Sequence, residues 1–252
     1  MRSRDGRLGV GIIALTPLGP VLASALAGAG HALIGIAVPD DGAEERAQAM
    51  LPAVPILDEA TVVERSELVI LASDDEHLPA LIERITKANG WMQGQLVMHT
   101  APSFGTACLS DAFDAGVIPL AVHPAIDVTG TSLDLARLRE GWCAVTAPRP
   151  VLPIAQALVV ETGAEPVIID EADRPAYGDA VTAVTDLTKR LVQQATSTLS
   201  GIGIENPGMF LSSLVRSAAD SALADATELR LDPDDAFPAD AADGAPPTES
   251  PE

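Results

Sequence analysis

Residues 8–39 read LGVGIIALTPLGPVLASALAGAGHALIGIAVP and contain no charged side chain. The run is long enough to cross a bilayer, for which about 20 apolar residues suffice, but its prolines and glycines interrupt it. They divide it into a strand-like piece (10–14), a helix-like piece (17–29) and a second strand-like piece (33–38). Parallel strands that are buried on both faces are continuous apolar runs of this kind. The stretch therefore predicts a strand–helix–strand unit.

An alternative interpretation is a secretory signal peptide or a membrane anchor. Arg2, Arg4 and Arg7 precede the apolar run, and the sequence at 25–27 resembles a cleavage site. The interruptions argue against it, and the two cysteines of the chain cannot form a disulfide framework, which is typical of a reducing compartment. We therefore expect a cytoplasmic protein without a membrane partner, and cell fractionation distinguishes the two interpretations.

The alternation of strand-like and helix-like segments continues along the chain. Strand-like runs lie at 55–57, 68–72, 95–99, 117–122, 143–146 and 166–169, and helix-like stretches at 58–66, 76–87, 105–113 and 152–162. Alternation of this kind predicts right-handed βαβ units and a parallel sheet. After Asp170 only helical periodicity remains, at 176–201 and 207–229. The sequence predicts an α/β protein, with a doubly wound parallel sheet at 1–169 and a small all-helical domain at 170–229.

Composition excludes some functions. The net charge is −21, from 36 acidic and 15 basic residues, which argues against nucleic acid and anionic membranes because phosphate binding needs Lys and Arg patches. Aromatic residues make up only 3%, so the chain lacks a stacking platform for bases and its core must be aliphatic. Seven of the acids lie in 232–252, which contains no Lys or Arg. We expect 230–252 to be a disordered acidic tail; the alternative is a tail that binds a partner.

In a doubly wound sheet, the first strand-to-helix turn is the usual phosphate site. The dinucleotide fingerprint there is G-x-G-x-x-G, whereas this chain has Ala14, Leu15, Thr16, Pro17, Leu18 and Gly19. Gly19 keeps the position that allows close packing of the helix on the strand. Thr16 adds a side chain where a pyrophosphate needs bare backbone, and Pro17 removes one N–H. The same two residues predict a strong helix start, with Thr16 as N-cap. Ala14, Thr16, Leu18 and Gly19 are the candidate cofactor-binding residues of this turn.

The end of the second strand adds a constraint on the cofactor. An acid at this place takes the ribose hydroxyls of NAD, whereas a basic residue accommodates the extra phosphate of NADP. Here Asp40 and Asp41 follow the strand, and Arg46 is the first basic residue after them. Asp40 is therefore a candidate cofactor-binding residue that favours NAD over NADP. The alternative is that this segment is only a solvated turn.

Four segments carry a resemblance to a known family: Leu68–Asp75 (LVILASDD), His99-Thr100, Leu120–Pro124 (LAVHP) followed by Thr129–Thr131, and Arg174–Tyr177 (RPAY). In this order they resemble the bacterial Rossmann-like proteins that carry the domain of unknown function 2520 at their C-terminus. That family is similar to pyrroline-5-carboxylate reductase and the deazaflavin-dependent NADP oxidoreductases. The resemblance implies a Rossmann-like domain, an NAD or NADP cofactor, a small-molecule ligand in the interdomain cleft, and a homodimer formed through the helical domain.

The sequence departs from these relatives at three places. They usually have intact glycines in the first turn, and often His-Thr-Ser-Gly where this chain has His99-Thr100-Ala101-Pro102. Many of them carry histidines just after the tyrosine that matches Tyr177, where this chain has Gly178-Asp179. Each departure removes a polar or permissive group from the expected site.

Two histidines are candidates for proton chemistry. His99 and His123 each end a predicted strand, at the edge of the sheet where ligands bind. Histidine is the usual proton donor near neutral pH, so either ring can protonate or orient a substrate carbonyl or imine. The alternative is that each ring anchors a loop by hydrogen bonds to the backbone. The spacing of histidines and cysteines indicates no metal site.

Lys189 is a further candidate catalytic residue, and Ser73 is a further candidate cofactor-binding residue. Related hydroxyacid dehydrogenases place a catalytic lysine on the first long helix of the second domain, which by analogy makes Lys189 a candidate; the alternative is an exposed pair with Asp186. Ser73 follows a predicted strand where the nicotinamide would lie, and the acids at 74–76 would favour a positively charged group there.

These observations predict an oxidoreductase that transfers a hydride between a nicotinamide cofactor and a small carbonyl or imine, with a degraded phosphate-binding loop. The alternative is a non-catalytic binding or regulatory protein that keeps the fold without the redox step. Ala14, Thr16 and Pro17 motivate that alternative.

Overall fold

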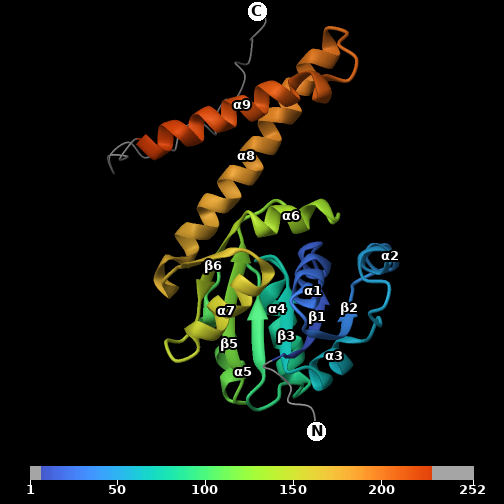
Figure 1. The fold of residues 1–252 in the computed structure, drawn as a ribbon, viewed down its shortest axis with the longest axis vertical. Helices are drawn as coiled ribbons and strands as arrows, with labels where there is room; N and C mark the ends of the chain where they lie inside the picture. Colours follow the sequence, from blue (N-terminus) through green and yellow to red (C-terminus); the bar gives the residue numbers. More distant parts are fainter. Residues whose placement is uncertain (1–6, 229–252) are drawn as a thin grey trace, which may run out of the picture. The chain divides into compact units, whose positions relative to one another are not determined.

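The computed structural model describes residues 7–228 (Figure 1). Its strands are β1 (Gly9–Ala14), β2 (Ala32–Ala37), β3 (Leu68–Ala72), β4 (Leu96–His99), β5 (Ile118–Pro124), β6 (Trp142–Thr146) and β7 (Glu165–Ile168). Its helices are α1 (Leu18–Gly28), α2 (Asp41–Met50), α3 (Glu59–Arg65), α4 (Leu78–Lys87), α5 (Ser110–Phe113), α6 (Leu133–Arg139), α7 (Leu152–Thr162), α8 (Arg174–Gly201) and α9 (Pro207–Glu228). The expected α/β sheet with a helical C-terminal region is confirmed. The segment 230–252, expected to be a disordered tail, lies outside the described residues.

The apolar run at 8–39 folds as the strand–helix–strand unit that its interrupting prolines and glycines predict. It contains β1, α1 and β2, and β1 pairs with β2 in parallel. Within the described residues, no helix combines the length and the hydropathy needed to cross a membrane. The run is apolar because most of β1, the second half of β2 and the inner face of α1 are buried.

The sheet has seven strands in the order β2-β1-β3-β4-β5-β6-β7. All neighbouring pairs are parallel except β5 and β6, which are antiparallel. The expectation of a wholly parallel sheet is therefore wrong at this pair. Only the seven-residue helix α6 lies between the two strands. Such a helix is about 10 Å long, less than half of the roughly 23 Å of the seven-residue strand β5. The chain therefore re-enters the sheet from the edge at which β5 leaves it.

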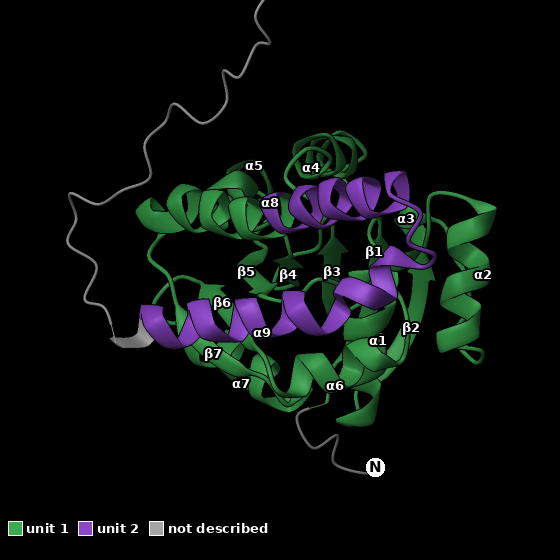
Figure 2. Cartoon of the chain, turned by 90° about the horizontal axis from the view of Figure 1, so that it is seen from above, with its two compact units in different colours: residues 1–186 green, residues 187–252 purple. Residues whose placement is uncertain are grey.

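Helices cover both faces of the sheet. Figure 2 shows α4 and α5 on one side and α1, α6 and α7 on the other. One core cluster packs α1 and α7 against residues such as Ile12 and Ile70, and the second packs α3 and α4 against residues such as Val69 and Leu71. Successive residues of a strand point to opposite faces, so continuous apolar runs fill both clusters. Among the described residues, Trp91 is the buried aromatic side chain of these clusters, and Phe104 packs against the second one. The rest of the core is aliphatic.

Two helices were not expected from the sequence. In α2 only Ala47 is buried, so it lacks the apolar stripe that marks a helix in sequence. Its N-terminus is capped by Asp40, whose carboxylate accepts the backbone N–H of Ala43 at 2.8 Å. Helix α6 has only seven residues and follows a loop, so it is too short to show a clear helical pattern in the sequence. Conversely, the strand expected at 55–57 forms only an isolated bridge, between Ile56 and Ile36.

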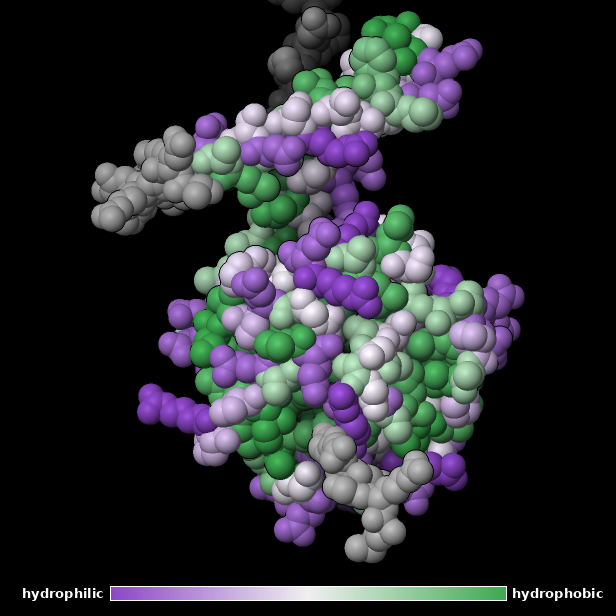
Figure 3. Space-filling view, in the orientation of Figure 1, coloured by the Kyte–Doolittle hydropathy of each residue, from purple (hydrophilic) through white to green (hydrophobic). Residues whose placement is uncertain are grey.

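The chain divides into two compact units, residues 1–186 and 187–252. The domain boundary that we expected at residue 169 stays a prediction. Unit 1 holds the sheet and the first turns of α8. Arg174, at the start of α8, accounts for this because its side chain bonds to the sheet. In unit 2, most large apolar side chains of the two helices are exposed; Figure 3 shows hydrophobic surface on this hairpin.

Gly19 is where α1 approaches the sheet. A Cβ at this position would lie 2.5 Å from the Cβ of Ala14 and 3.2 Å from that of Ala72, which confirms the expected role of this glycine in helix–strand packing. We predict that Gly19→Ala lowers the free energy of unfolding by about 1–3 kcal/mol, because the added methyl overpacks the contact. Gly28→Ala is the matched control, since no atom lies within 4 Å of its Cβ position, and it should be neutral or stabilise the helix by up to about 1 kcal/mol. Denaturant unfolding measures both, and equal effects would contradict the packing argument.

Candidate functional site

The turn between β1 and α1 is bonded to the neighbouring strand. The carbonyl oxygen of Ala72 accepts the backbone N–H groups of Leu15 at 2.9 Å and of Thr16 at 3.1 Å. The hydroxyl of Thr16 also donates to it, at 3.3 Å. Thr16 is therefore not the N-cap of α1, contrary to expectation: Pro17 occupies that position, without a side-chain capping bond. The hydroxyl bonds to β3 because the turn passes directly over the end of that strand.

Few backbone amides of this turn remain for a phosphate. Pro17 and Pro20 have no N–H, and the N–H of Gly19 donates to the carbonyl of Thr16 at 3.2 Å. Among residues 17–20, this leaves the N–H of Leu18. An intact fingerprint supplies several amides at this place. The weakened phosphate binding that we expected of this loop stays a prediction.

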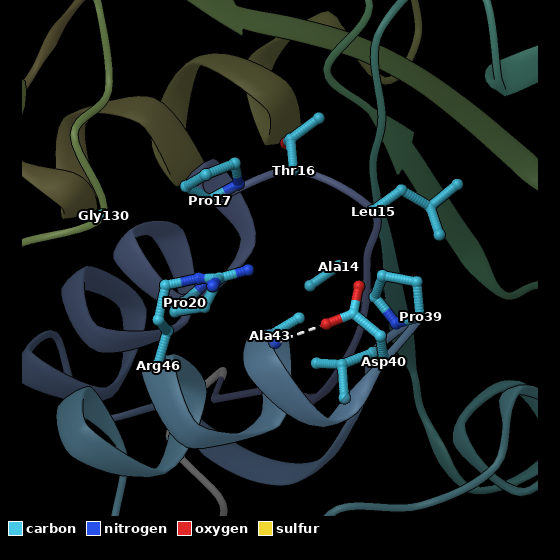
Figure 4. A pocket seen from close by; sticks show the side chains of 11 residues that line it. Ala14, Leu15, Thr16, Pro17, Pro20, Pro39, Asp40, Ala43, Arg46 and Gly130 are labelled. Carbon is cyan, nitrogen blue, oxygen red and sulfur yellow. Dashed lines mark hydrogen bonds between the residues drawn. The ribbon is translucent and has the colours of Figure 1, made fainter.

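A cavity of about 100 Å³ lies beside this turn, at the carboxyl ends of β1 and β2. Its walls are mostly apolar, and its polar lining side chains are Thr16, Asp40 and Arg46. Figure 4 shows Arg46 extending from α2, and Asp40 hydrogen-bonded to Ala43 at the start of the same helix. Leu18 and Gly19 are buried and do not line this cavity. Sequence reasoning missed Arg46 because α2 was not expected, although Arg46 is the first basic residue after the second strand.

Gly130 closes another part of the cavity wall. It belongs to the Thr-Gly-Thr loop, which is wrapped around the buried carboxylate of Asp134: the N–H groups of Thr129, Gly130 and Thr131 all donate to Oδ2, at 2.8–3.1 Å. Burial would raise the pKa of Asp134, but the hydrogen bonds from this loop hold it below the ordinary value. The loop that carries part of the family resemblance therefore has a clear structural role.

Ser73 is only 2% exposed, at the end of β3. Its N–H donates to the hydroxyl of Thr100 at 3.1 Å, and its own hydroxyl donates to the carbonyl of Asp74 at 3.1 Å. The bond to Thr100 joins the ends of β3 and β4. The cofactor-binding role of Ser73 stays a prediction, and the structure gives its hydroxyl a local partner.

The acids that follow Ser73 also have local partners. Asp74 accepts the backbone N–H of His77 at 2.9 Å and bonds to the imidazole Nδ1 of that residue at 2.7 Å. Asp75 accepts the N–H of Ser103 at 3.1 Å and its hydroxyl at 2.6 Å. Two of the three carboxylates that we expected to attract a positively charged group are therefore already hydrogen-bonded.

His99 is fully buried at the end of β4. Its Nε2 lies 2.8 Å from the carbonyl oxygen of Gly105, to which it must donate, while Nδ1 has no hydrogen-bond partner. Burial lowers the pKa of His99 to about 4. The ring bonds to the loop after β4 and is fully buried, and its catalytic role stays a prediction.

His123, near the end of β5, is only half-buried. Its Nδ1 lies 2.7 Å from the hydroxyl oxygen of Tyr177, on the first turn of α8. Burial, followed by the positive charge of Arg174, lowers the pKa of His123 to about 4. Burial also raises the pKa of Tyr177 to about 12. His123 and Tyr177 are thus a neutral hydrogen-bonded pair at neutral pH.

Arg174 connects this pair to the sheet. The side chain is fully buried, and the guanidinium donates at 2.7–3.5 Å to four oxygens: the hydroxyl of Thr146 and the carbonyls of Ala121, Ala144 and Pro102. Its Cζ also lies 5.7 Å from the centre of the Tyr177 ring. From the sequence, Arg174 and Tyr177 were recognised only as part of a segment that carries the family resemblance. Their role in the site was not expected, because the hydrogen bonds of Arg174 join residues 28 to 72 positions apart in the chain.

Lys189 belongs to unit 2 and is exposed on α8. Its catalytic role stays a prediction. The structure therefore brings together His99, His123, Arg174 and Tyr177 in unit 1, and groups Ala14, Thr16, Asp40 and Arg46 at the cavity. Within residues 7–228, no three His, Cys, Asp or Glu side chains are grouped so as to hold a metal ion.

His99 and His123 predict a pH dependence of stability, because burial lowers the pKa of each ring. Their pKa is about 4 in the folded protein and about 6.5 in an unfolded chain, so between these values the unfolded state binds more protons. The free energy of unfolding should therefore fall as the pH falls from 6.5 to 4, by up to about 3 kcal/mol for each ring.

Urea unfolding at several pH values measures this dependence. His123→Gln should make the decrease smaller. His77→Gln is the control: His77 is exposed, and its pKa is raised by the hydrogen bond to Asp74, so this variant should leave the decrease in place. A wild-type stability that is constant between pH 6.5 and 4 would contradict the neutral state of His99 and His123.

Two families match the sequence in succession. Residues 2–124 match the Rossmann-like domain, and residues 141–230 match the domain of unknown function 2520. A comparison with curated proteins finds no match.

Solved structures of similar fold cover most of the chain. A Bacteroides fragilis protein named as a candidate NADP oxidoreductase has a TM-score of 0.72 and 16% identity, covering 85% of this chain and 80% of its own. Pyrroline-5-carboxylate reductase from Streptococcus pyogenes has a TM-score of 0.61 and 16% identity, covering 91% and 83%. The pyrroline carboxylate reductase of Plasmodium falciparum, solved with NADP bound, has a TM-score of 0.60 and 10% identity, covering 89% and 80%.

Likenesses at such low identity establish the fold alone. The family follows from the sequence matches, which fall on the sheet domain and the helical region in the same order as the expected resemblance. The chain belongs to the family of Rossmann-like proteins that carry the domain of unknown function 2520 at their C-terminus.

Proposed function

We propose that the protein is an NAD(P)-dependent oxidoreductase that acts on a small carbonyl or imine compound. The observation that carries the proposal is the cavity at the carboxyl ends of β1 and β2, on the same edge of the sheet as His123, which lies near the end of β5. Three strand spacings, about 14 Å, separate β1 from β5 along this edge. The fold neighbours named as oxidoreductases, one of them solved with NADP, support the same class of reaction.

The residues present fit the cofactor in part. The apolar walls of the cavity, with Asp40 and Arg46, suit the adenosine end. One oxygen of Asp40 caps α2, which leaves the other for a ribose hydroxyl. The pyrophosphate would meet the N–H of Leu18 and the side chain of Thr16. A bound nicotinamide cofactor supplies or accepts a hydride, and in this proposal His123 orients the oxygen or nitrogen of the substrate beside it.

The proposed function predicts that the protein binds a nicotinamide cofactor. We expect NADH and NADPH to bind with dissociation constants weaker than those of an intact fingerprint, because the first turn offers few amides. Titration of the purified protein with each cofactor, followed by cofactor fluorescence, measures this. No binding of either cofactor at millimolar concentration would refute the proposed function.

The choice between NAD and NADP depends on two opposed side chains. Asp40 favours NAD, but Arg46 lines the same cavity and attracts the additional phosphate of NADP. We predict that Arg46→Ala weakens NADPH binding about tenfold, equivalent to about 1.4 kcal/mol, and changes NADH binding less. Arg65→Ala, on the exposed surface of α3, is the control with the same change of net charge. Equal losses for both cofactors would show that Arg46 does not contact that phosphate.

A non-catalytic binding or regulatory protein is the second candidate function. It is favoured by the amides of Leu15 and Thr16, which already donate to Ala72, and by the two prolines of the turn. It predicts that Thr16→Gly strengthens dinucleotide binding, while no variant gains turnover. Turnover of any carbonyl or imine substrate by the unaltered protein would contradict it.

We also propose that the protein forms a homodimer through unit 2. Among the described residues of this unit, the exposed large apolar side chains are Leu187, Leu191, Ile202, Met209, Phe210, Leu214 and Leu223, each with at least half of its surface accessible. Two helices provide too little core to bury such surface alone, and large exposed apolar patches mark interaction sites. A second copy of the same hairpin would cover it symmetrically.

We predict a dimer mass in sedimentation velocity at micromolar concentration, and a monomer for the Phe210→Glu/Leu214→Glu variant. Ala219→Glu is the control, since a spacing of nine residues places it half a turn around α9 from Phe210. A monomer mass for the wild type at all concentrations would exclude the homodimer.

A further inference from the structure

His123 and Tyr177 form a polar pair that the family comparison does not explain. The imidazole Nδ1 and the phenol oxygen are 2.7 Å apart, and the two rings meet edge to face with centroids 5.6 Å apart and an interplanar angle of 73°. No other hydrogen bond joins Nε2 of His123 to the described residues. The pair therefore has one internal hydrogen bond and one ring nitrogen left over.

The chemistry of the two groups sets the direction of the internal hydrogen bond. A phenol O–H is a stronger acid than the N–H of a neutral imidazole, and the bare imidazole nitrogen is a stronger base than the phenol oxygen. The favourable arrangement has Tyr177 donating its O–H to Nδ1 of His123. A neutral imidazole carries one proton, so that proton must be on Nε2.

The neighbouring charges keep the ring neutral. The guanidinium of Arg174 lies against the face of Tyr177, with Cζ 5.7 Å from the ring centre. A second proton on His123 would place a cation in a half-buried site close to Arg174. The carboxylate of Glu171 is also near Arg174, but it is bonded to the backbone N–H groups of Thr106 and Ala107.

We propose that Tyr177 is a positioning residue that holds His123 as a neutral Nε2–H donor, for an acceptor oxygen of a small-molecule ligand such as a carbonyl or carboxylate oxygen. The proposal rests on the proposed function in one respect, namely that the ligand is the substrate. It changes the expected ligand class: the acids after β3 suggested a positively charged group, but Asp74 and Asp75 are occupied by His77 and Ser103. The Nε2–H of His123, with the buried guanidinium of Arg174 nearby, instead favours a ligand group that carries negative charge.

Histidine side-chain NMR tests the tautomer without a cofactor or substrate. The chain has four histidines, and their ring nitrogens can be resolved in ¹⁵N-histidine-labelled protein by long-range ¹⁵N–¹H correlation. His31 is the internal standard: its Nδ1 accepts the backbone N–H of Leu8 at 3.1 Å, and a backbone amide can only donate. His123→Gln assigns the signals. At pH 7 we expect His123 to give the same pattern as His31, with bare Nδ1 and protonated Nε2.

The Tyr177→Phe variant tests whether the hydroxyl is responsible. We expect the His123 signals to shift toward a mixture of both tautomers, while those of His31 and His99 stay unchanged. A purely structural role of Tyr177 would lower the melting temperature without changing the tautomer. A wild-type His123 with its proton on Nδ1 overturns the proposal, as does an unchanged tautomer in Tyr177→Phe. The wild-type spectrum decides between the two hydrogen-bond directions even if the variant does not fold.

Two small probes test the ligand class. Sodium acetate presents carboxylate oxygens, and methylammonium chloride presents a cation of similar size. Acetate should shift the His123 Nε2 signal of the wild type, and it should do so more weakly in Tyr177→Phe; methylammonium should have no such effect. A response to methylammonium alone, or to neither probe, overturns the assignment of an acceptor oxygen. The cofactor titration is independent of these spectra, so failure of the proposed function is distinguishable from failure of this inference.

Discussion

The buried guanidinium of Arg174 is the interaction on which the arrangement of unit 1 depends most. Its acceptors are carbonyls of β5, β6 and the loop after β4, together with the hydroxyl of Thr146. Such a charge is costly to bury unless its N–H groups are satisfied. Here hydroxyl and carbonyl oxygens satisfy them, and no carboxylate in the described part of the chain bonds to the guanidinium. The side chain fixes the start of α8 against the sheet, and it thereby places Tyr177 beside His123.

The negative charge of the protein also has a structural function. Asp40 and Asp58 cap α2 and α3, Asp134 holds the loop at 129–131, and Glu171 accepts the amides of Thr106 and Ala107. Acids at helix N-termini and in turns satisfy N–H groups that would otherwise lack partners. The net charge of −21 is therefore partly the sum of local backbone requirements.

Much of the fold could be predicted from the sequence, because buried strands are marked by continuous apolar runs. The bounds of β3 and α7 agree with their apolar segments, Leu68–Ala72 and Leu152–Thr162. Helix α2 could not be predicted, because it buries a single residue. The antiparallel direction of β6 depends on the short helix before it, whose length is not marked by any apolar pattern. In the candidate site, the position of His123 near the end of a strand could be predicted from the sequence. The contacts of Arg174 and Tyr177 could not, because they join distant segments and no local sequence pattern indicates them.

The carbonyl oxygen of Ala72 has a consequence for any anion at the first turn. It holds the amides of Leu15 and Thr16, so a phosphate that recruited them would have to take them from a peptide oxygen. The gain would be the difference between two hydrogen bonds, and the abandoned carbonyl would need another donor. Binding of a phosphate at the turn thus competes with the hydrogen bonds to Ala72 for the same two N–H groups, and those bonds attach the end of β1 to β3.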